Sequence, residues 1–100
     1  MTRLEVAPRA DGQIRRIARW WHEHRPAAPS LFSEELADAL ESLMVHPTLG
    51  TAYGERRGTP VRRLRLPRSR YHVYFSYDVE RDVVSVRAVW HGSRGSGPPL

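Results

Sequence analysis

The hydrophobic period changes part-way along the chain, and this change limits the folds that the chain can adopt. Before Gly50, apolar residues recur at the spacing of amphipathic helices, whereas after Pro60 they alternate with polar residues, as in strands. Helices followed by a run of consecutive strands favour an α+β domain, with the helices packed on a mainly antiparallel sheet. The 100 residues suffice for one such domain with a thin core.

Two helices are predicted, one over residues 11–24 and one from about residue 30 to Val45. Prolines separate them, and His46–Pro47 ends the second. The short break indicates an antiparallel helical hairpin. The apolar stripe of the first helix consists of Ile14, Ile17, Ala18 and Trp21, and that of the second consists of Phe32, Leu36, Ala39, Leu40 and Leu43.

Four strands are predicted, over residues 2–6, 61–66, 71–78 and 83–91, while residues 51–60 form a polar connection. The element order is therefore β-α-α-β-β-β, beginning with an N-terminal strand. We expect one domain over residues 1–92, followed by a flexible glycine- and proline-rich tail over residues 93–100.

Strict alternation along the strands predicts which side chains face the helices and which lie on the open face of the sheet. The expected helix-facing residues are Leu64, Leu66, Val73, Phe75, Val84, Val86 and Ala88, and Ser85 and Val89 face away from the helices. The open face then carries a group suited to anion binding: Arg63, Arg65, His72, Tyr74, Arg87 and His91.

The cationic residues are unevenly distributed. The formal net charge is +5, every cation apart from histidine is an arginine, and arginines are dense between Arg56 and Arg70. A GC-rich genome explains the preference for arginine over lysine but not the clustering. A dense basic segment indicates a nucleic acid, ribosomal or acidic protein partner, and a solvated strand edge is the alternative.

Several classes of protein are excluded or disfavoured. The chain has no cysteine, which excludes disulfides, thiolate nucleophiles and cysteine-based zinc sites. The histidines lack clustered carboxylates, so we expect neither a metal nor another cofactor. Because there is no membrane-length apolar run or signal peptide, we expect a cytoplasmic protein.

The pair Trp20–Trp21 is the most unusual local feature. Adjacent helical residues point about 100° apart, so Trp21 is expected in the core stripe and Trp20 at its edge. A core role is favoured for the pair, although an exposed Trp20 is also a candidate partner contact.

Four segments together resemble the RelE/ParE superfamily of toxins. They are residues 43–50 (LMVHPTLG), 61–66 (VRRLRL), 71–78 (YHVYFSYD) and 86–94 (VRAVWHGSR), and they occur in the family's order. The resemblance implies a toxin of a type II toxin–antitoxin system with the fold order given above. It also implies a cognate antitoxin whose C-terminal segment wraps the toxin. From the basic sheet face and the apolar edge of the helical hairpin, we expect that segment to be acidic and amphipathic and to cover both.

Members of the superfamily act on different targets. RelE-like toxins cut messenger RNA on the ribosome without a metal, whereas ParE-like toxins poison DNA gyrase. If this chain is RelE-like, the resemblance makes Arg63, Arg65, His72 and His91 the candidate catalytic residues. However, His72 and Gly92 occupy positions where RelE-like toxins have arginines, and no tyrosine follows the last predicted strand.

The ParE-like interpretation is favoured, because the helices are long and the last strand ends in His91-Gly92-x-Arg94. The chain would then be a binding protein rather than an enzyme. A degenerate, non-toxic interaction module is a third hypothesis. The candidate partner- and target-binding residues are Arg63, Arg65, Tyr74, Arg87, His91, Arg94 and Trp20.

Overall fold

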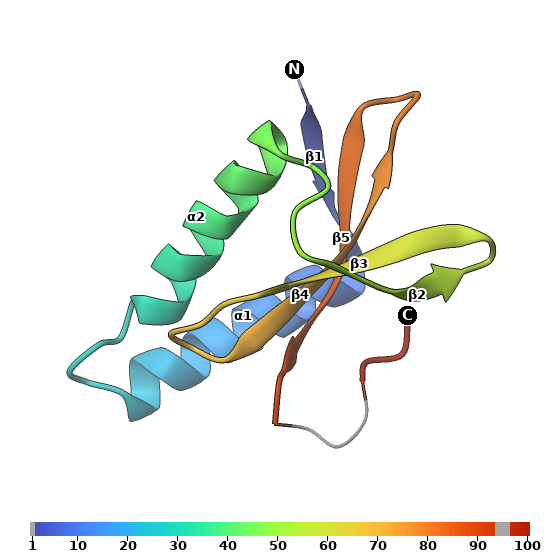
Figure 1. Ribbon diagram of the computed structural model, residues 1–100. Coiled ribbons are helices and arrows are strands. Elements are labelled where there is room, and N and C mark those ends of the chain that lie inside the picture. The colour runs from blue at the N-terminus through green and yellow to red at the C-terminus, as the bar shows by residue number, and fades with distance from the viewer. Residues whose placement is uncertain (1, 94–96) are drawn as a thin grey trace.

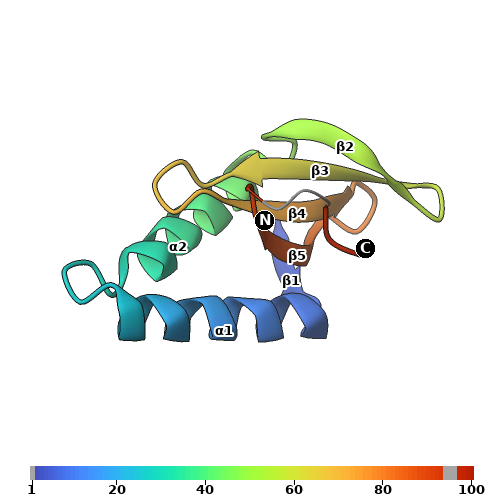
Figure 2. The same ribbon diagram turned by 90° about the horizontal axis from the view of Figure 1, so that it is seen from below.

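A five-stranded sheet carries both helices on one of its sides (Figures 1 and 2). The computed structural model describes residues 2–93 and 97–100. The strand order is β1-β5-β4-β3-β2, with β1 parallel to β5 and the other pairs antiparallel. The α+β fold class is therefore confirmed. The elements are β1 (Arg3–Val6), α1 (Pro8–His24), α2 (Leu31–Val45), β2 (Thr51–Arg56), β3 (Thr59–Arg65), β4 (Tyr71–Asp78) and β5 (Val83–His91).

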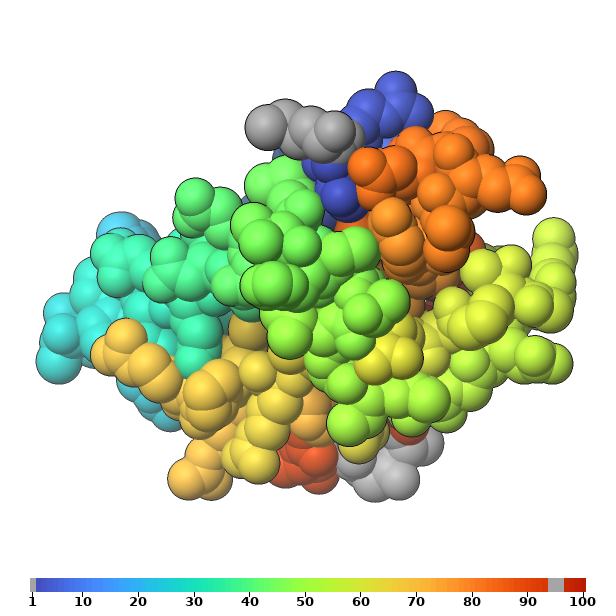
Figure 3. Space-filling view, turned by 45° about the horizontal axis from the view of Figure 1, so that its top comes forward, coloured from blue at the N-terminus to red at the C-terminus, as the bar shows by residue number. Residues whose placement is uncertain are grey.

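The strand β2 was not predicted and makes the order β-α-α-β-β-β-β. It pairs with β3 through a tight turn in which Arg57 and Gly58 both have positive φ, at 50° and 80°. Every residue of β2 is exposed. A strand without a buried side shows no alternation of apolar and polar residues, so the sequence pattern that reveals the other strands is missing here. The hairpin projects from the body of the protein, as does the β4–β5 turn (Figure 3).

The helix α1 begins three residues before its predicted start. Pro8 occupies the first helical turn, where its missing N–H has no intrahelical partner in any case and its fixed φ suits the helix. Asp11 still lies in the first turn, favourably placed at the positive end of the helix dipole. Its carboxylate also pairs with Arg15 at 2.9 Å, and both side chains are largely exposed.

The core consists of two clusters beneath the helices and one on the opposite side of the sheet. Beneath the helices, Phe32 and Leu36 pack with Val73 and Val86, and a second cluster forms around Leu43. The predicted apolar stripes of both helices enter these clusters. The third cluster contains the buried side chains of Val61, Tyr74 and Ala88, with Trp90 and Leu100 packed against them.

The strand β5 extends beyond its partner β1. Pairing with β1 ends at Val86, and the chain then enters α1. The next outward-pointing amide on this edge belongs to Val89, and it donates a hydrogen bond of 2.8 Å to Oε1 of the buried Gln13 on α1. This side chain satisfies a buried amide that a longer β1 would otherwise pair.

The turn between β3 and β4 is fastened to α2 by a single carboxylate. The two oxygens of Glu35 accept hydrogen bonds from the backbone amides of Arg68 (2.7 Å) and Ser69 (2.9 Å). Within the turn, the amide of Arg70 donates to the carbonyl of Leu66. These contacts fix the ends of the two strands that carry the candidate site.

We expect Glu35→Gln to lower the free energy of unfolding by about 1–3 kcal/mol, because the amide nitrogen cannot accept the second backbone hydrogen bond. Urea denaturation of both proteins would measure the loss. Glu41→Gln is the control, since Glu41 is an exposed carboxylate on the same helix. Equal stability of the Glu35 and Glu41 variants would contradict a role for Glu35 in holding the turn.

Candidate functional site

Arg63 and Arg65 of β3 and His72 of β4 lie on the side of the sheet that faces away from the helices. The register pairs Arg63 with Tyr74 and Arg65 with His72, whereas the intervening pair, Leu64 and Val73, enters the helix-side core. Alternation in these two strands is therefore as predicted. The structure brings Arg63, Arg65, His72 and Tyr74 together on one face.

In β5 the predicted alternation fails after Val86. A β-bulge makes Tyr74 pair with Ala88 while Phe75 pairs with Val86, so Arg87 is an additional residue in this strand. An inserted residue reverses the side to which the following side chains point. The expectation that Ala88 faces the helices and Val89 faces away is wrong: Val89 packs beneath the helices and Ala88 packs on the other side.

The same bulge changes the position of His91. Its ring packs edge-on against Tyr71, which belongs to the helix-side core, with 4.9 Å between the ring centroids. The predicted position of His91 on the open face is therefore wrong. Arg87 remains on the open face, where its Nε donates to the Ser76 hydroxyl at 3.0 Å.

His91 nevertheless shares a pocket with the open-face cations, because it lies at the end of the sheet where both sides are accessible. This pocket, of about 260 Å³, is called the cationic pocket below. Nδ1 of His91 accepts a hydrogen bond from the amide of Ser93 at 3.1 Å, which places the proton of a neutral ring on Nε2. The pocket is lined by Arg65, Arg70, His72, His91, Gly92 and Ser93.

The electrostatics of the cationic pocket act most strongly on His72. Burial lowers the pKa of His72, and the positive charges of Arg63 and Arg65 and the neighbouring His91 lower it further. At neutral pH the His72 ring is therefore an uncharged acceptor among guanidinium groups. Gly92 leaves room for this ring, since a Cβ at that position would lie 3.1 Å from the His72 Cε1.

Tyr74 lies on the expected face but is not accessible there. Only 2% of its surface is exposed. The ring of Tyr53, from the unpredicted strand β2, packs edge-on against it with centroids 4.8 Å apart, and Leu100 packs on the same cluster. The expected role of Tyr74 as a partner contact would require Tyr53 and the C-terminal residues to move aside.

The described part of the C-terminal tail, residues 97–100, lies against the protein. Pro98 is buried, and the carbonyl of Pro99 accepts a hydrogen bond of 2.7 Å from the Arg9 guanidinium on α1. The expected flexible tail is thus held at its far end. Arg94, a predicted target contact, lies outside the described residues.

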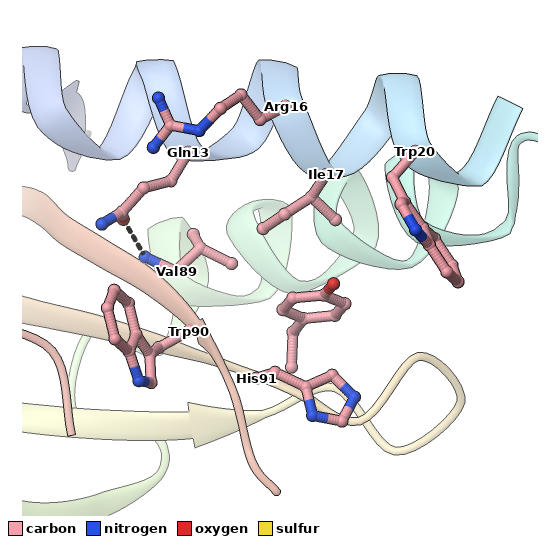
Figure 4. A pocket seen from close by; sticks show the side chains of 8 residues that line it. Gln13, Arg16, Ile17, Trp20, Val89, Trp90 and His91 are labelled. Carbon is pink, nitrogen blue, oxygen red and sulfur yellow. Dashed lines mark hydrogen bonds between the residues drawn. The ribbon is translucent and has the colours of Figure 1, made fainter. Parts of the chain in front are cut away.

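The tryptophans of α1 lie as predicted. Trp21 packs against the helix-side core, while Trp20 is at the edge of the stripe with 39% of its surface exposed. The Trp20 ring is stacked with His24 and lies 4.6 Å from the guanidinium carbon of Arg25. Its exposed surface borders a groove of about 220 Å³ between α1 and the end of β5 (Figure 4).

Sequence reasoning missed three of the six residues that line the cationic pocket: Arg70, Gly92 and Ser93. Arg70 appears in the sequence as a solvated turn charge, and only its positive φ of 68° and the adjoining strand ends direct it toward the pocket. Ser93 belongs to the predicted tail, and its contact with His91 depends on where β5 ends. A histidine two residues before a serine is too common a pattern to indicate such a contact.

Residues 2–93 and 97–100 contain neither a metal-binding cluster nor a membrane-spanning helix. These residues contain no group of three or more histidine, aspartate or glutamate side chains placed to hold a metal ion. In the same residues, neither helix has the length and apolar character needed to cross a bilayer.

Comparison with known proteins identifies the family. The sequence profile described as "ParE toxin of type II toxin-antitoxin system, parDE" matches residues 4–95. The chain belongs to this ParE toxin family. It is thus a toxin of a type II toxin–antitoxin system, in agreement with the resemblance of its four segments to the RelE/ParE superfamily. No curated protein sequence matches it.

Solved structures agree with the ParE-family fold. A chain from the chromosomal ParDE toxin–antitoxin system of P. aeruginosa is 14% identical, with a TM-score of 0.71 over 91% of this chain and 96% of that one. The intact RelBE toxin–antitoxin complex of E. coli contains a chain that is 21% identical, with a TM-score of 0.58 over 94% and 100%. The isolated E. coli RelE toxin is also 21% identical, with a TM-score of 0.60 over 96% and 89%.

In this ParE-family toxin, the lowered pKa of His72 makes stability depend on pH. The unfolded chain, with a histidine pKa near 6.5, binds a proton at a higher pH than the folded protein does. The free energy of unfolding should therefore fall as the pH drops through the range between 6.5 and the lowered value. Above pH 6.5 the contribution of His72 to the free energy of unfolding is constant.

We expect His72→Gln to flatten this part of the pH dependence, because the neutral amide does not titrate. Denaturation of both proteins at about pH 7.5 and about pH 5 would reveal the difference. His22→Gln is the control, since His22 is an exposed residue of α1 outside the cationic pocket. An unchanged pH dependence in the His72 variant would contradict the burial and charge environment described here.

Proposed function

We propose that this ParE-family toxin arrests growth by binding and poisoning DNA gyrase, and that the cationic pocket with the adjoining Arg63 is its target surface. The composition of the pocket supports this proposal most directly. Its lining offers guanidinium and imidazole groups but no carboxylate or tyrosine. Such a surface is better equipped to bind an acidic or phosphate-bearing partner than to complete an acid–base reaction.

The proposed binding residues on the target surface are Arg63, Arg65 and His91, with Arg87 beside them on the open face. Arg63 is only partly fixed, since its guanidinium carbon lies 5.4 Å from the ring of Tyr53. Arg62, by contrast, is tied to the backbone, donating to the carbonyls of Leu49 and Gly50. We therefore exclude Arg62 from the target surface.

A cognate antitoxin is the proposed partner that neutralises the toxin in the cytoplasm. The net charge of +5 favours an acidic antitoxin segment. Such a segment would dock on the toxin through an apolar side and engage its arginines through carboxylates. The proposal requires neither a metal nor another cofactor.

The gyrase proposal predicts that the purified toxin inhibits supercoiling and causes cleaved DNA to accumulate. Arg65→Ala should weaken inhibition about tenfold or more, because it removes a charge from the centre of the target surface. Titration of toxin into a supercoiling assay would measure the effect. Arg15→Ala is the matched control, since Arg15 lies on α1 and is paired with Asp11. A saturating dose without effect on gyrase would refute the proposal.

Ribosome-dependent cleavage of messenger RNA is the second candidate, favoured by the uncharged ring of His72 beside Arg65 and His91. Neutral His72 would take the proton of a 2′-hydroxyl group. The freed oxygen would bond to the phosphorus as the bond to the 5′ oxygen breaks, giving a cyclic phosphate. His91 would supply the proton to the leaving 5′ oxygen.

The nuclease candidate predicts cuts in messages that are being translated, lost in both His72→Gln and His91→Gln with folding intact. Primer extension on messenger RNA from a translation extract would detect such cuts. If messages stay intact and the toxin does not arrest translation in the extract, this candidate is dismissed. A protein that leaves growth, gyrase and translation unaffected would instead be the degenerate interaction module.

A further inference from the structure

A second pocket lies where the C-terminal end of α1 meets the turn between β3 and β4. We call it the helix-end pocket; its volume is about 330 Å³. It shares Arg70 and His91 with the cationic pocket but opens beside the tryptophans of α1. Its lining contains no carboxylate, and consists of Trp20, Trp21, Arg25, Arg68, Ser69, Arg70, Tyr71 and His91.

Two polar atoms of this lining are buried without a hydrogen-bond partner among residues 2–93 and 97–100. They are the indole Nε1 of Trp21 and the hydroxyl oxygen of Ser69. Ser69 is 96% buried, since only 4% of its surface is exposed. A buried donor without an acceptor is unfavourable, so such groups in a native protein call for a partner. An indole N–H can only donate, and the missing partner must therefore be an acceptor.

The surrounding charges indicate that this acceptor is an anion. The described residues contain two ion pairs, and neither includes Arg25, Arg68 or Arg70. The nearby carboxylate of Glu35 is already occupied by two backbone amides of the turn. The pocket thus offers guanidinium groups that have no carboxylate partner within the described part of the chain, beside two unpartnered polar atoms that are buried beneath its lining.

The guanidinium group of Arg25 lies against the indole rings. Its guanidinium carbon lies 4.6 Å from the centroid of the Trp20 ring and 5.9 Å from that of Trp21. The side chain is exposed, and its hydrogen bond goes to the carbonyl of its neighbour His24. An arriving anion can therefore draw Arg25 away from the rings and supply the charged partner that it lacks among the described residues.

The adjoining groove determines what kind of molecule would carry the anion. The groove of Figure 4 shares Trp20, Tyr71 and His91 with the helix-end pocket, and it adds the apolar side chains of Ile17 and Val89. A polypeptide can place an apolar side chain in the groove and an acidic one from the same segment in the pocket. Tryptophan, tyrosine and arginine are also the residues most enriched at the energetic centres of protein interfaces.

We propose that the helix-end pocket is an anchor site for a glutamate or aspartate side chain of a protein partner, with a neighbouring apolar residue in the groove. We assign that segment to the antitoxin, and this assignment rests on the proposed function. Its carboxylate would pair with Arg25 and Arg68 and, with Arg25 displaced from the indole rings, accept from the Trp21 indole and the Ser69 hydroxyl. This anchor does not include Arg63 or Arg65, but it shares Arg70 and His91 with the target surface.

Binding of a short acidic peptide to the toxin tests the proposal. The probe is the blocked peptide Ala-Leu-Glu-Leu-Ala, with its glutamine counterpart as the matched control. We expect the glutamate peptide to shift the assigned Trp21 indole N–H resonance saturably in an NMR titration. Arg68→Gln should weaken that binding about tenfold, whereas Arg19→Gln, an exposed arginine of α1 outside the pocket, should not.

Ser69→Ala separates an anchor from a structural role. The variant removes an unpartnered buried hydroxyl, so it should raise the melting temperature of the free toxin. It should at the same time weaken binding of the glutamate peptide. Equal binding of the two peptides, or equal binding to wild type and the Ser69 variant, would overturn the proposal. The proposal would also be overturned if the peptide had no effect and a short DNA oligonucleotide shifted the Trp21 resonance in a way that requires Arg68. Growth arrest by the unmodified toxin is measured separately, and its absence would refute the proposed function without affecting the peptide result.

Discussion

The additional residue in β5 opposite Tyr74 and Phe75 determines how both sides of this protein are built. Without it, Val89 would point away from α1 and the helix would lose an apolar contact at the middle of its stripe. With it, the Val89 side chain enters the core, and the Val89 amide reaches Gln13. His91 turns at the same time toward Tyr71, so the end of the strand contributes to surfaces on both sides of the sheet.

The sheet has two unlike sides because each is covered differently. One side is packed by the helices, and its residues are the larger part of the core. The other side is covered over its centre by Tyr53 and Leu100, which seal Tyr74, and is left open where Arg65 and His72 lie. The cations are thus concentrated at one end of the sheet, where burial and mutual repulsion keep His72 neutral. The electrostatic field of such a surface attracts negatively charged partners before they make contact.

The turn of residues 67–70 joins the two candidate surfaces. Glu35 fastens it from α2, and its arginines then point toward the cationic pocket and the helix-end pocket. Arg70 lines both pockets, and so does His91. A partner seated at the end of α1 would therefore contact groups that also border the target surface. This proximity offers a direct physical route by which a bound partner could interfere with target binding.

The sequence by itself determined the helical hairpin, four of the strands and the side taken by β3 and β4, because a buried side imposes its period on the residues. It also supplied the arginines, and Trp21 in the core. Only the tertiary structure decided the rest. An exposed strand such as β2 carries no apolar period, and a bulge is invisible to a rule of strict alternation. The covering of Tyr74 by Tyr53 and Leu100, like the shared pocket of Arg65 and His91, arises from contacts between segments far apart in the chain, which local pattern does not encode.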